Sequence, residues 1–223
     1  MKILHLVLYS KSEYYNKMKE ITSEYYKKYI DIDTYYYYWD ENISDEYLLE
    51  DNELKIKGKE VYIPGILQKT IKAFEFFKEK IDNYGYIIRS NISTIINFEK
   101  LIPILSQKNY DYGLFFNKKQ KAFYPSGTSM LYNKKIFNFV LENKHKLRYD
   151  IIDDYSLGLL LYYNYVDFKK LELCNLKDYF CENPSVNTNY ENYIIFRNKS
   201  DNRENDLIIM KNIIEIITKK IDK

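Results

Sequence analysis

Two adjacent aspartates, Asp153 and Asp154, stand directly before an apolar segment that runs from Leu157 to Leu161. A carboxylate in this position can cap the helix that the apolar segment predicts, because a helix N-terminus carries partial positive charge. A carboxylate held there and left partly exposed can also take a proton from a substrate as a general base. The residues alone leave both roles open.

A second polar cluster follows a buried apolar stretch and comprises Arg89, Ser90, Asn91, Ser93 and Thr94. Ligands of open α/β sheets bind outside the carboxyl ends of the strands, so this cluster is a candidate binding site. The alternative is structural: Ser90 or Asn91 caps the next helix and Arg89 makes a surface ion pair. Arginine deserves notice because the chain has only four, whereas lysine is abundant.

The same strand-end rule selects Tyr9 and Ser10 after the first apolar stretch, and Arg197 and Lys199 after the last. Arg197 and Lys199 could hold a pair of phosphates, or they could belong to a solvated loop. Gly127 lies in a polar segment of a chain with six glycines, which favours either a close backbone approach to a ligand or an ordinary turn.

Several classes of site are excluded by what the sequence lacks. His5 lies in an apolar run and His145 in a lysine-flanked loop, so we expect neither to be catalytic. Cys174 and Cys181 form no CxxC pair, which argues against a zinc site and favours free thiols. No Walker or GxGxxG loop is present. The DxD of Asp31–Asp33 precedes a strand rather than following one, so we do not expect it to bind a metal.

The composition of the chain excludes some classes of binding partner. The net charge of +2 argues against a general nucleic-acid binder. No apolar run reaches the roughly 18 residues that a transmembrane helix needs, and the first apolar run is too short for a signal peptide. We therefore expect a soluble cytoplasmic protein without a transmembrane segment, in the host cytoplasm if it is viral.

Apolar periodicity predicts the elements that position these residues. Strands are expected at Ile3–Tyr9, Thr34–Trp39, Tyr84–Ile88, Tyr110–Phe116 and Tyr193–Phe196, with a strand or loop at Asp167–Leu176. Helices are expected at Lys11–Tyr29 with Ser12 as N-cap, Pro64–Ile81, Ser93–Leu105, Lys134–Lys144, Asp153–Tyr163 and Asp206–Lys220. The remaining predictions are an acidic loop or short turn at Asp40–Glu53, a short strand pair around Gly58 within Leu54–Tyr62, a loop entering a strand at Ala122–Tyr132, and an irregular segment at Asp178–Asn192.

Early strands alternate with helices, and the later pattern is mixed. This order predicts an α/β layered fold with a mostly parallel central mixed sheet flanked by helices. No Pro/Gly/Ser linker divides residues 1–223, so we predict a single domain. The aromatic run Tyr35–Trp39 could stack on the rings of a ligand, but its alternation favours packing into two layers of core.

The order of several motifs resembles a known family. These motifs are Glu60–Thr70, Ile87–Thr94, Pro125–Thr128 and Asp153–Gly158. Together they resemble small nucleotide-sugar glycosyltransferases of the GT-A fold, similar to the beta-1,3-galactosyltransferase-like enzymes and more closely to short glycosyltransferases of large DNA viruses. The resemblance extends from residue 1 to about residue 215 and implies a single-domain GT-A (Rossmann-like) fold.

The resemblance also implies roles for residues. Asp154, or second Asp153, would deprotonate the acceptor hydroxyl in an inverting displacement. Lys69 and Thr70 match a Lys-Thr pair of the family, and Gly127 and Thr128 match a loop that lines the donor sugar and acceptor. The implied donor-binding residues are Tyr9, Ser10, Lys69, Arg89, Ser90, Asn91, Ser93, Gly127, Thr128, Arg197 and Lys199.

The family's metal site departs from its usual composition here. An acidic triplet would hold Mn²⁺ or Mg²⁺ on the donor diphosphate, but the matching place reads Arg89-Ser90-Asn91. Asn91 offers one neutral oxygen, which is a weak ligand for a hard cation. Metal-independent action is the alternative, with Arg89, Arg197 and Lys199 as fixed charges that offset the leaving diphosphate.

These expectations define the leading hypothesis and its rivals. The leading hypothesis is a hexosyltransferase-like enzyme of glycan biosynthesis that moves a sugar from a UDP-sugar donor to a glycan or glycoprotein acceptor. The first rival is a non-catalytic nucleotide-sugar or carbohydrate-binding relative, suggested by the missing metal carboxylates. The second is a nucleotidyltransferase, which the absence of glycine from the segment after the first strand disfavours.

Overall fold

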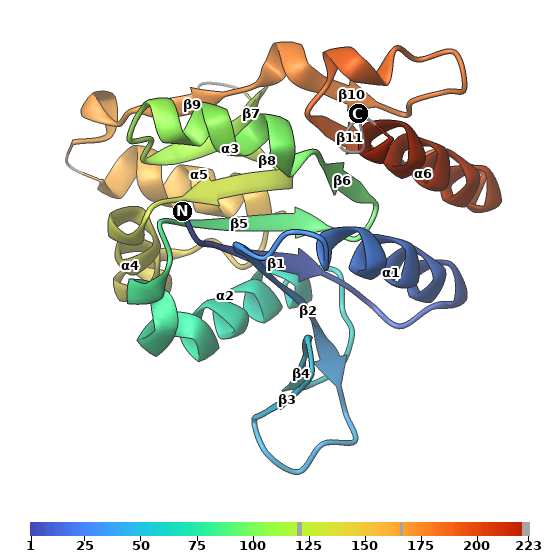
Figure 1. Cartoon of the computed structure of the whole chain (residues 1–223). Coiled ribbons are helices and arrows are strands. Elements are labelled where there is room, and N and C mark those ends of the chain that lie inside the picture. Colours follow the sequence, from blue (N-terminus) through green and yellow to red (C-terminus); the bar gives the residue numbers. More distant parts are fainter. Residues whose placement is uncertain (120–121, 166, 220–223) are drawn as a thin grey trace.

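The computed structural model describes residues 1–119, 122–165 and 167–219. Within these residues a central sheet of eight strands has the order β3-β4-β2-β1-β5-β8-β7-β9 (Figure 1). In that order the strands are Tyr47–Glu50, Glu53–Lys57, Ile32–Asp40, Ile3–Leu8, Tyr86–Asn91, Ala122–Tyr132, Tyr112–Lys119 and Leu173–Asn175. β1 lies parallel to β2 and β5, β2 to β4, and β7 to β9, whereas β3 and β8 run antiparallel to their neighbours. The predicted mixed, mostly parallel α/β sheet is therefore confirmed.

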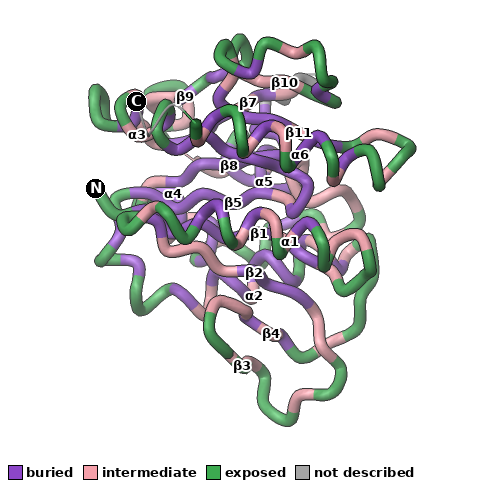
Figure 2. The backbone as a smooth tube through the Cα atoms, turned by 45° about the vertical axis from the view of Figure 1, so that its right-hand side comes forward, coloured by how far each residue is buried: buried purple, intermediate pink, exposed green. Residues whose placement is uncertain are grey.

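Helices cover both faces of the sheet. The helices that pack into one hydrophobic core are α1 (Glu13–Tyr26), α3 (Phe98–Gln107) and α6 (Arg203–Thr218), and those of the other core are α2 (Gly65–Phe77), α4 (Lys134–Glu142) and α5 (Asp153–Asn164). Figure 2 shows the buried strands β1, β5 and β8 between these two layers. The prediction of one domain over residues 1–223 stays a prediction.

The aromatic run in β2 divides between the two cores. Tyr36 and Tyr38 belong to the core under α1, and Tyr37 belongs to the core under α2. Successive side chains of a strand point to opposite faces, so a run of aromatic residues fills both layers. The expected packing role of this run is confirmed.

A smaller sheet of three strands places the C-terminal part of the chain beside its central part. Its order is β10 (Phe180–Glu182), β11 (Ile195–Arg197) and β6 (Thr94–Ile96), with β11 antiparallel to β6. Arg197 is paired in register with Thr94. The residues after β11 therefore lie beside the residues that follow β5, about 100 positions earlier in the chain.

The predicted helix Ser93–Leu105 is wrong in its first turn. Residues 94–96 form β6, and the helix begins at Phe98 with Asn97 as N-cap, whose side chain accepts the Lys100 N–H at 3.3 Å. Ser90 and Asn91 are not caps, because β5 continues through them to Asn91. The β-branched Thr94, Ile95 and Ile96 suit either element, and β11 decides the outcome by pairing with them.

The region from Asp40 to Tyr62 also differs from its prediction. The acidic loop contains β3, which pairs with β4 through a turn where Asp51 has φ 50°. The strand pair is therefore centred on this turn and not on Gly58, which follows β4. Gly58 lies against the indole of Trp39, and a Cβ on it would stand 2.5 Å from the ring.

Gly127 lies in a strand rather than in a loop. β8 spans Ala122–Tyr132, and its register against β7 jumps from Leu114↔Met130 to Phe116↔Pro125. Residues 126–129 therefore bulge out of the ladder between these pairs. A bulge next to a cleft re-aims the local backbone groups, and here it turns Gly127 toward β5 and α5.

Smaller differences concern the ends of elements. Ser12 caps α1 as predicted, through its bond from the Tyr15 N–H. The last helix begins at Arg203 with Asn202 as cap, and its predicted end, residue 220, lies outside the described residues. Short 3₁₀ turns, some of them in segments predicted to be irregular, occupy Lys78–Asn83 (η1), Lys144–Lys146 (η2), Phe168–Lys170 (η3), Lys177–Tyr179 (η4) and Tyr190–Asn192 (η5).

Candidate functional site

A cavity of about 530 Å³ opens at the carboxyl ends of β1 and β5. It gathers segments that are far apart in the sequence. Among its lining residues are Tyr9, Ser10, Tyr15, Glu60, Tyr62, Arg89, Asn91, Ser93, Gly127, Asp153, Asp154, Arg197, Lys199 and Arg203. The strand-end rule thus brings together most of the polar residues that the sequence singled out.

Arg89 is buried and makes contacts through all three of its nitrogens. Its Nη2 lies 2.6 Å from Asp153 Oδ2, its Nη1 donates to the Gly127 carbonyl at 2.5 Å, and its Nε donates to the Tyr37 hydroxyl at 3.2 Å. Only 1% of the Arg89 side chain is exposed, against 13% for Asp153. Burial opposes the charge on Arg89, but the charge of Asp153 and the interactions with Tyr37 together outweigh it and raise the pKa of the guanidinium above its ordinary value.

Asp154 is held by two backbone N–H groups at the start of α5. Gly127 N–H donates to Oδ2 and Tyr155 N–H donates to Oδ1, both at 2.8 Å. Burial, followed by the charge of Asp153, raises the pKa of Asp154 above its ordinary value, although these N–H groups work against the rise. Neither aspartate is the N-cap, because that position is Ile152. Asp154 is therefore a fixed carboxylate with an increased proton affinity.

Gly127 connects the two charged groups. Its carbonyl accepts from Arg89 and its N–H donates to Asp154. A Cβ at this position would lie 3.1 Å from Arg89 Nη1 and 3.4 Å from Asp154 Oδ2. The peptide can approach both side chains this closely because glycine has no side chain.

Lys69 supports the cavity from behind its wall. The buried Nζ donates to the Tyr9 carbonyl at 2.9 Å and to Glu60 Oε2 at 2.8 Å. Burial lowers the pKa of Lys69, and the neighbouring Glu60 carboxylate acts against this. Lys69 does not line the cavity, so it fixes the end of β1 and the Glu60 segment. Its neighbour Thr70 bonds the Tyr37 hydroxyl at 2.9 Å.

Three cationic side chains also line the cavity, and they are Arg197, Lys199 and Arg203. Arg197 Nη1 donates to the Thr128 hydroxyl, while its Nε is buried without a partner among the described residues. Burial lowers the pKa of Arg197. Arg203 Nη1 lies 2.9 Å from Asp206 Oδ2, and Lys199 is exposed.

Besides Lys69, two residues proposed from the sequence lie behind this cavity instead of in it. Ser90 is fully buried and its hydroxyl bonds His5 Nε2 at 2.8 Å. The buried Thr128 hydroxyl bonds Ser126 at 3.1 Å. Their hydroxyls are thus engaged within the protein.

Four further side chains with polar groups line the cavity without having been predicted from the sequence, and they are Arg203, Tyr15, Glu60 and Tyr62. Arg203 is one of the four arginines and opens a helix after the Asn202 cap, which is a signal that could have been used. Tyr15 and Tyr62 are hidden among 26 tyrosines. Their positions follow from the fold, since Tyr15 comes from α1 and Tyr62 from the segment before α2.

The residues at the expected metal position do not fit a divalent cation. The guanidinium of Arg89 and its partner Asp153 occupy the place of the acidic triplet, and Asn91 contributes one neutral oxygen. Within the described residues, no group of three or more His, Cys, Asp or Glu side chains is arranged to hold a metal ion. Asp33 of the DxD pairs with Lys2 at 2.8 Å near the start of β2, away from the carboxyl ends of the strands.

The remaining candidates behave as structural residues. His5 is fully buried, and burial lowers its pKa to about 3. His145 is exposed in η2, and the free thiols of Cys174 and Cys181 agree with their prediction. No helix in the described part of the chain combines the length and apolarity required to cross a membrane.

Comparison with known proteins shows that the fold of this chain resembles that of a solved structure. No protein-family model and no curated protein matches the chain. A solved structure does match, that of a glycosyltransferase involved in the glycosylation of the major capsid of PBCV-1. The two chains share 14% identity with a TM-score of 0.58, over 95% of this chain and 100% of that one. The chain therefore has an α/β fold similar to that of a viral glycosyltransferase.

Proposed function

We propose that the protein is a glycosyltransferase that moves a sugar from a nucleotide-diphosphate donor to a hydroxyl acceptor. The observation that carries the proposal is the cavity at the strand ends, which is lined by the Asp154 carboxylate and by the cationic side chains of Arg197, Lys199 and Arg203. A proton acceptor and a set of fixed cations are the two groups that this reaction requires.

Asp154 acts as the base in this proposal. Its carboxylate accepts the proton of the acceptor hydroxyl while the acceptor oxygen forms a bond to the anomeric carbon. The bond from that carbon to the phosphate oxygen breaks, and the nucleoside diphosphate leaves with the electron pair, with inversion. The raised pKa of Asp154 increases its proton affinity, and its two N–H bonds fix its orientation.

Asp153 has a different role from Asp154. Its Oδ2 is bound to Arg89, so this oxygen is already engaged within the protein. Arg89 in turn holds the Gly127 peptide that positions Asp154. Arg89 is thus a positioning residue in this proposal and not the principal contact of the diphosphate.

The leaving diphosphate is neutralised by side chains instead of by a metal ion. Arg197, Lys199 and Arg203 provide fixed positive charge, and Arg197 Nε is a buried donor without a partner in the described chain. Leaving such a hydrogen-bond donor unpaired is costly, and a phosphate oxygen would satisfy it.

The proposed sugar donor is a UDP-sugar, with Tyr15 and Tyr62 available to contact the uracil base. The proposed acceptor is a glycan or glycoprotein. The free thiols Cys174 and Cys181 support a reducing, cytoplasmic location.

A thermal-shift panel tests the proposal. UDP, UDP-glucose, UDP-galactose and UDP-N-acetylglucosamine are compared with ADP and GDP, each with manganese or with EDTA. We expect the UDP ligands to raise the melting temperature equally in both conditions, and Lys199→Ala to reduce the shift while Lys78→Ala, an exposed lysine of η1, does not. Lack of any nucleotide effect would reject the proposed donor site, and an effect that needs manganese would reject metal independence.

The second candidate is a binding protein without catalytic activity. The specific observation in its favour is the buried Arg89–Asp153 pair, which replaces reactive carboxylates by a structural contact. Nucleotide-sugar binding without transfer to glycan acceptors, and without slow hydrolysis of the donor, would support this candidate against the enzyme.

A further inference from the structure

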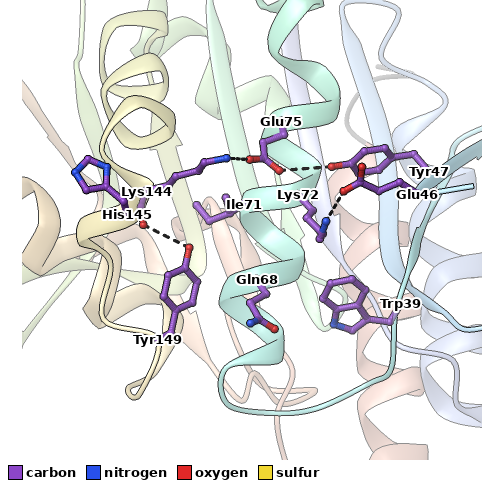
Figure 3. A pocket seen from close by; sticks show the side chains of 10 residues that line it. All are labelled: Trp39, Glu46, Tyr47, Gln68, Ile71, Lys72, Glu75, Lys144, His145 and Tyr149. Atoms are coloured by element: carbon purple, nitrogen blue, oxygen red, sulfur yellow. Dashed lines mark hydrogen bonds and ion pairs between the residues drawn. The ribbon is translucent and has the colours of Figure 1, made fainter.

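A second cavity, of about 860 Å³, lies on the outer side of α2 (Figure 3). Its volume falls in the range of cavities that hold small organic ligands. Helix α2 forms its floor through Gln68, Ile71 and Glu75, and its sides come from β2, β3 and the segment from η2 to α5. None of the roles proposed for the first cavity involves these residues.

Three aromatic side chains from separate elements face this cavity. They are Trp39 at the end of β2, Tyr47 at the start of β3, and Tyr149 before α5. Figure 3 shows Trp39 and Tyr149 on opposite sides of Gln68. Trp39 is fixed because its Nε1 donates to the Gly65 carbonyl at 3.2 Å and Gly58 lies against its ring. Rigid aromatic faces carry partial negative charge and attract the C–H groups of sugar rings.

The lysines and glutamates of the cavity are already paired with one another, and His145 also lines it. Lys72 binds Glu46, and Lys144 binds Glu75, which also accepts from the Tyr47 hydroxyl at 3.5 Å. A charged ligand that binds one of these four side chains would have to break its pair. A neutral ligand with many hydroxyl groups can instead use the remaining lone pairs and N–H groups of the same side chains.

We propose that this cavity binds a neutral oligosaccharide. Sugar rings stack on Trp39 and Tyr149, and ring hydroxyls bond Gln68, an exposed side chain with no hydrogen-bond partner recorded in the described part of the chain. The proposal does not require catalysis. The role of the ligand rests on the proposed function, under which the site holds a distal part of the acceptor glycan. The reason is the chain segment between the two cavities. Glu60 and Tyr62 line the first cavity, and Gly65, which follows them, accepts a hydrogen bond from Trp39 in the second.

The chain offers a specific reporter, since Trp39 is its single tryptophan. The wild-type protein is titrated with maltohexaose, cellohexaose, chitohexaose and xylohexaose, and with the anionic hexagalacturonate as a control for charge. Tryptophan emission is excited at the long-wavelength edge of the absorption band, where tyrosine absorbs little. We expect a saturable change with at least one neutral hexasaccharide and none with hexagalacturonate.

Variants then place the binding in the cavity. Tyr149→Ala and Gln68→Ala should each weaken the affinity, Tyr149→Ala by about tenfold, or about 1.4 kcal/mol. Tyr163→Ala, which removes a tyrosine that is 71% exposed on α5, should leave it unchanged. The proposal is overturned if no neutral hexasaccharide changes the emission, if the anionic one binds best, or if both cavity variants bind like the wild type.

The outcome is independent of the proposed transfer reaction. Saccharide binding without UDP binding would reject the proposed function and leave this inference standing. UDP binding without saccharide binding would reject this inference and leave the proposed function standing.

Discussion

Arg89 Nη2 and Asp153 Oδ2 lie 2.6 Å apart beneath the cavity, and this ion pair separates the roles of two consecutive aspartates. Asp153 is tied to the guanidinium, whereas Asp154 is oriented by the Gly127 and Tyr155 N–H groups. Two carboxylates that are adjacent in the chain therefore meet different electrostatic environments. Such a division is how a protein assigns structural and proton-transfer roles to like groups.

Asp154→Asn should abolish sugar transfer while nucleotide binding stays within about threefold of the wild type, or about 0.7 kcal/mol. An amide cannot accept the proton of the acceptor hydroxyl. In the wild type the base is active when ionised, so transfer should fall as the pH falls through the raised pKa of Asp154, earlier than for an exposed aspartate. The kcat–pH profile measures this, and full turnover by a folded Asp154→Asn protein would contradict the assignment.

Arg89→Met should destabilise the protein by about 3–5 kcal/mol, because it leaves the mostly buried Asp153 without its partner. The double variant Arg89→Met/Asp153→Leu should recover part of this loss, since it removes both charges. Chemical denaturation of both variants and of Asp153→Leu gives the coupling free energy. Additive effects would show that the ion pair does not link the two positions energetically.

Stability should fall in mild acid because of His5. The folded-state pKa of His5 is lowered to about 3 by burial, whereas the unfolded chain takes up the proton near 6.5. The unfolded state binds more protons between these values, so the contribution of neutral His5 is present above pH 6.5 and is lost as the pH falls toward 3, by about 1.4 kcal/mol per pH unit.

The comparison variant is His5→Gln, which does not titrate and keeps a polar group near Ser90 and Thr34. Its free energy of unfolding should be lower at neutral pH but should decline less steeply between pH 6.5 and 3. Equal slopes for the two proteins would show that His5 does not contribute.

Gly158→Ala should destabilise the protein by about 1–3 kcal/mol, as overpacking does. An added Cβ would stand 2.2 Å from the Cβ of Tyr124, so α5 must move away from β8. Because α5 carries Asp154, activity should fall more than the melting temperature alone would explain. A Gly158→Ala protein with unchanged stability would contradict the packing described.

The sequence predicted the parts of the site that depend on local signals. The first apolar run, the Ser12 cap and the strand-end rule placed Tyr9, Arg89 and Arg197 near a common edge. It did not predict that Arg89 is buried, because its partners Tyr37, Gly127 and Asp153 lie 38 to 64 residues away. Local patterns carry no information on such distant neighbours.

The same reason explains the errors in secondary structure. Residues 94–96 became a strand because β11 pairs with them, and 126–129 became a bulge because the register with β7 changes. The Asp51 turn was missed because the acidic residues around it resemble a solvated loop. In each case the decision depends on strand pairing rather than on the residues of the segment itself.

The pairing of β11 with β6 affects the order in which parts of the cavity form while the chain is synthesised and folds. Asn198 bonds the Ser93 carbonyl across 105 positions of sequence, and Arg197, Lys199 and Arg203 arrive with it. During synthesis the segment that carries Asp153 and Asp154 is made before the segment that carries these three cations. Contacts of such long range close late, so the anion binding that we propose for this cavity should be among the last properties that the nascent chain acquires.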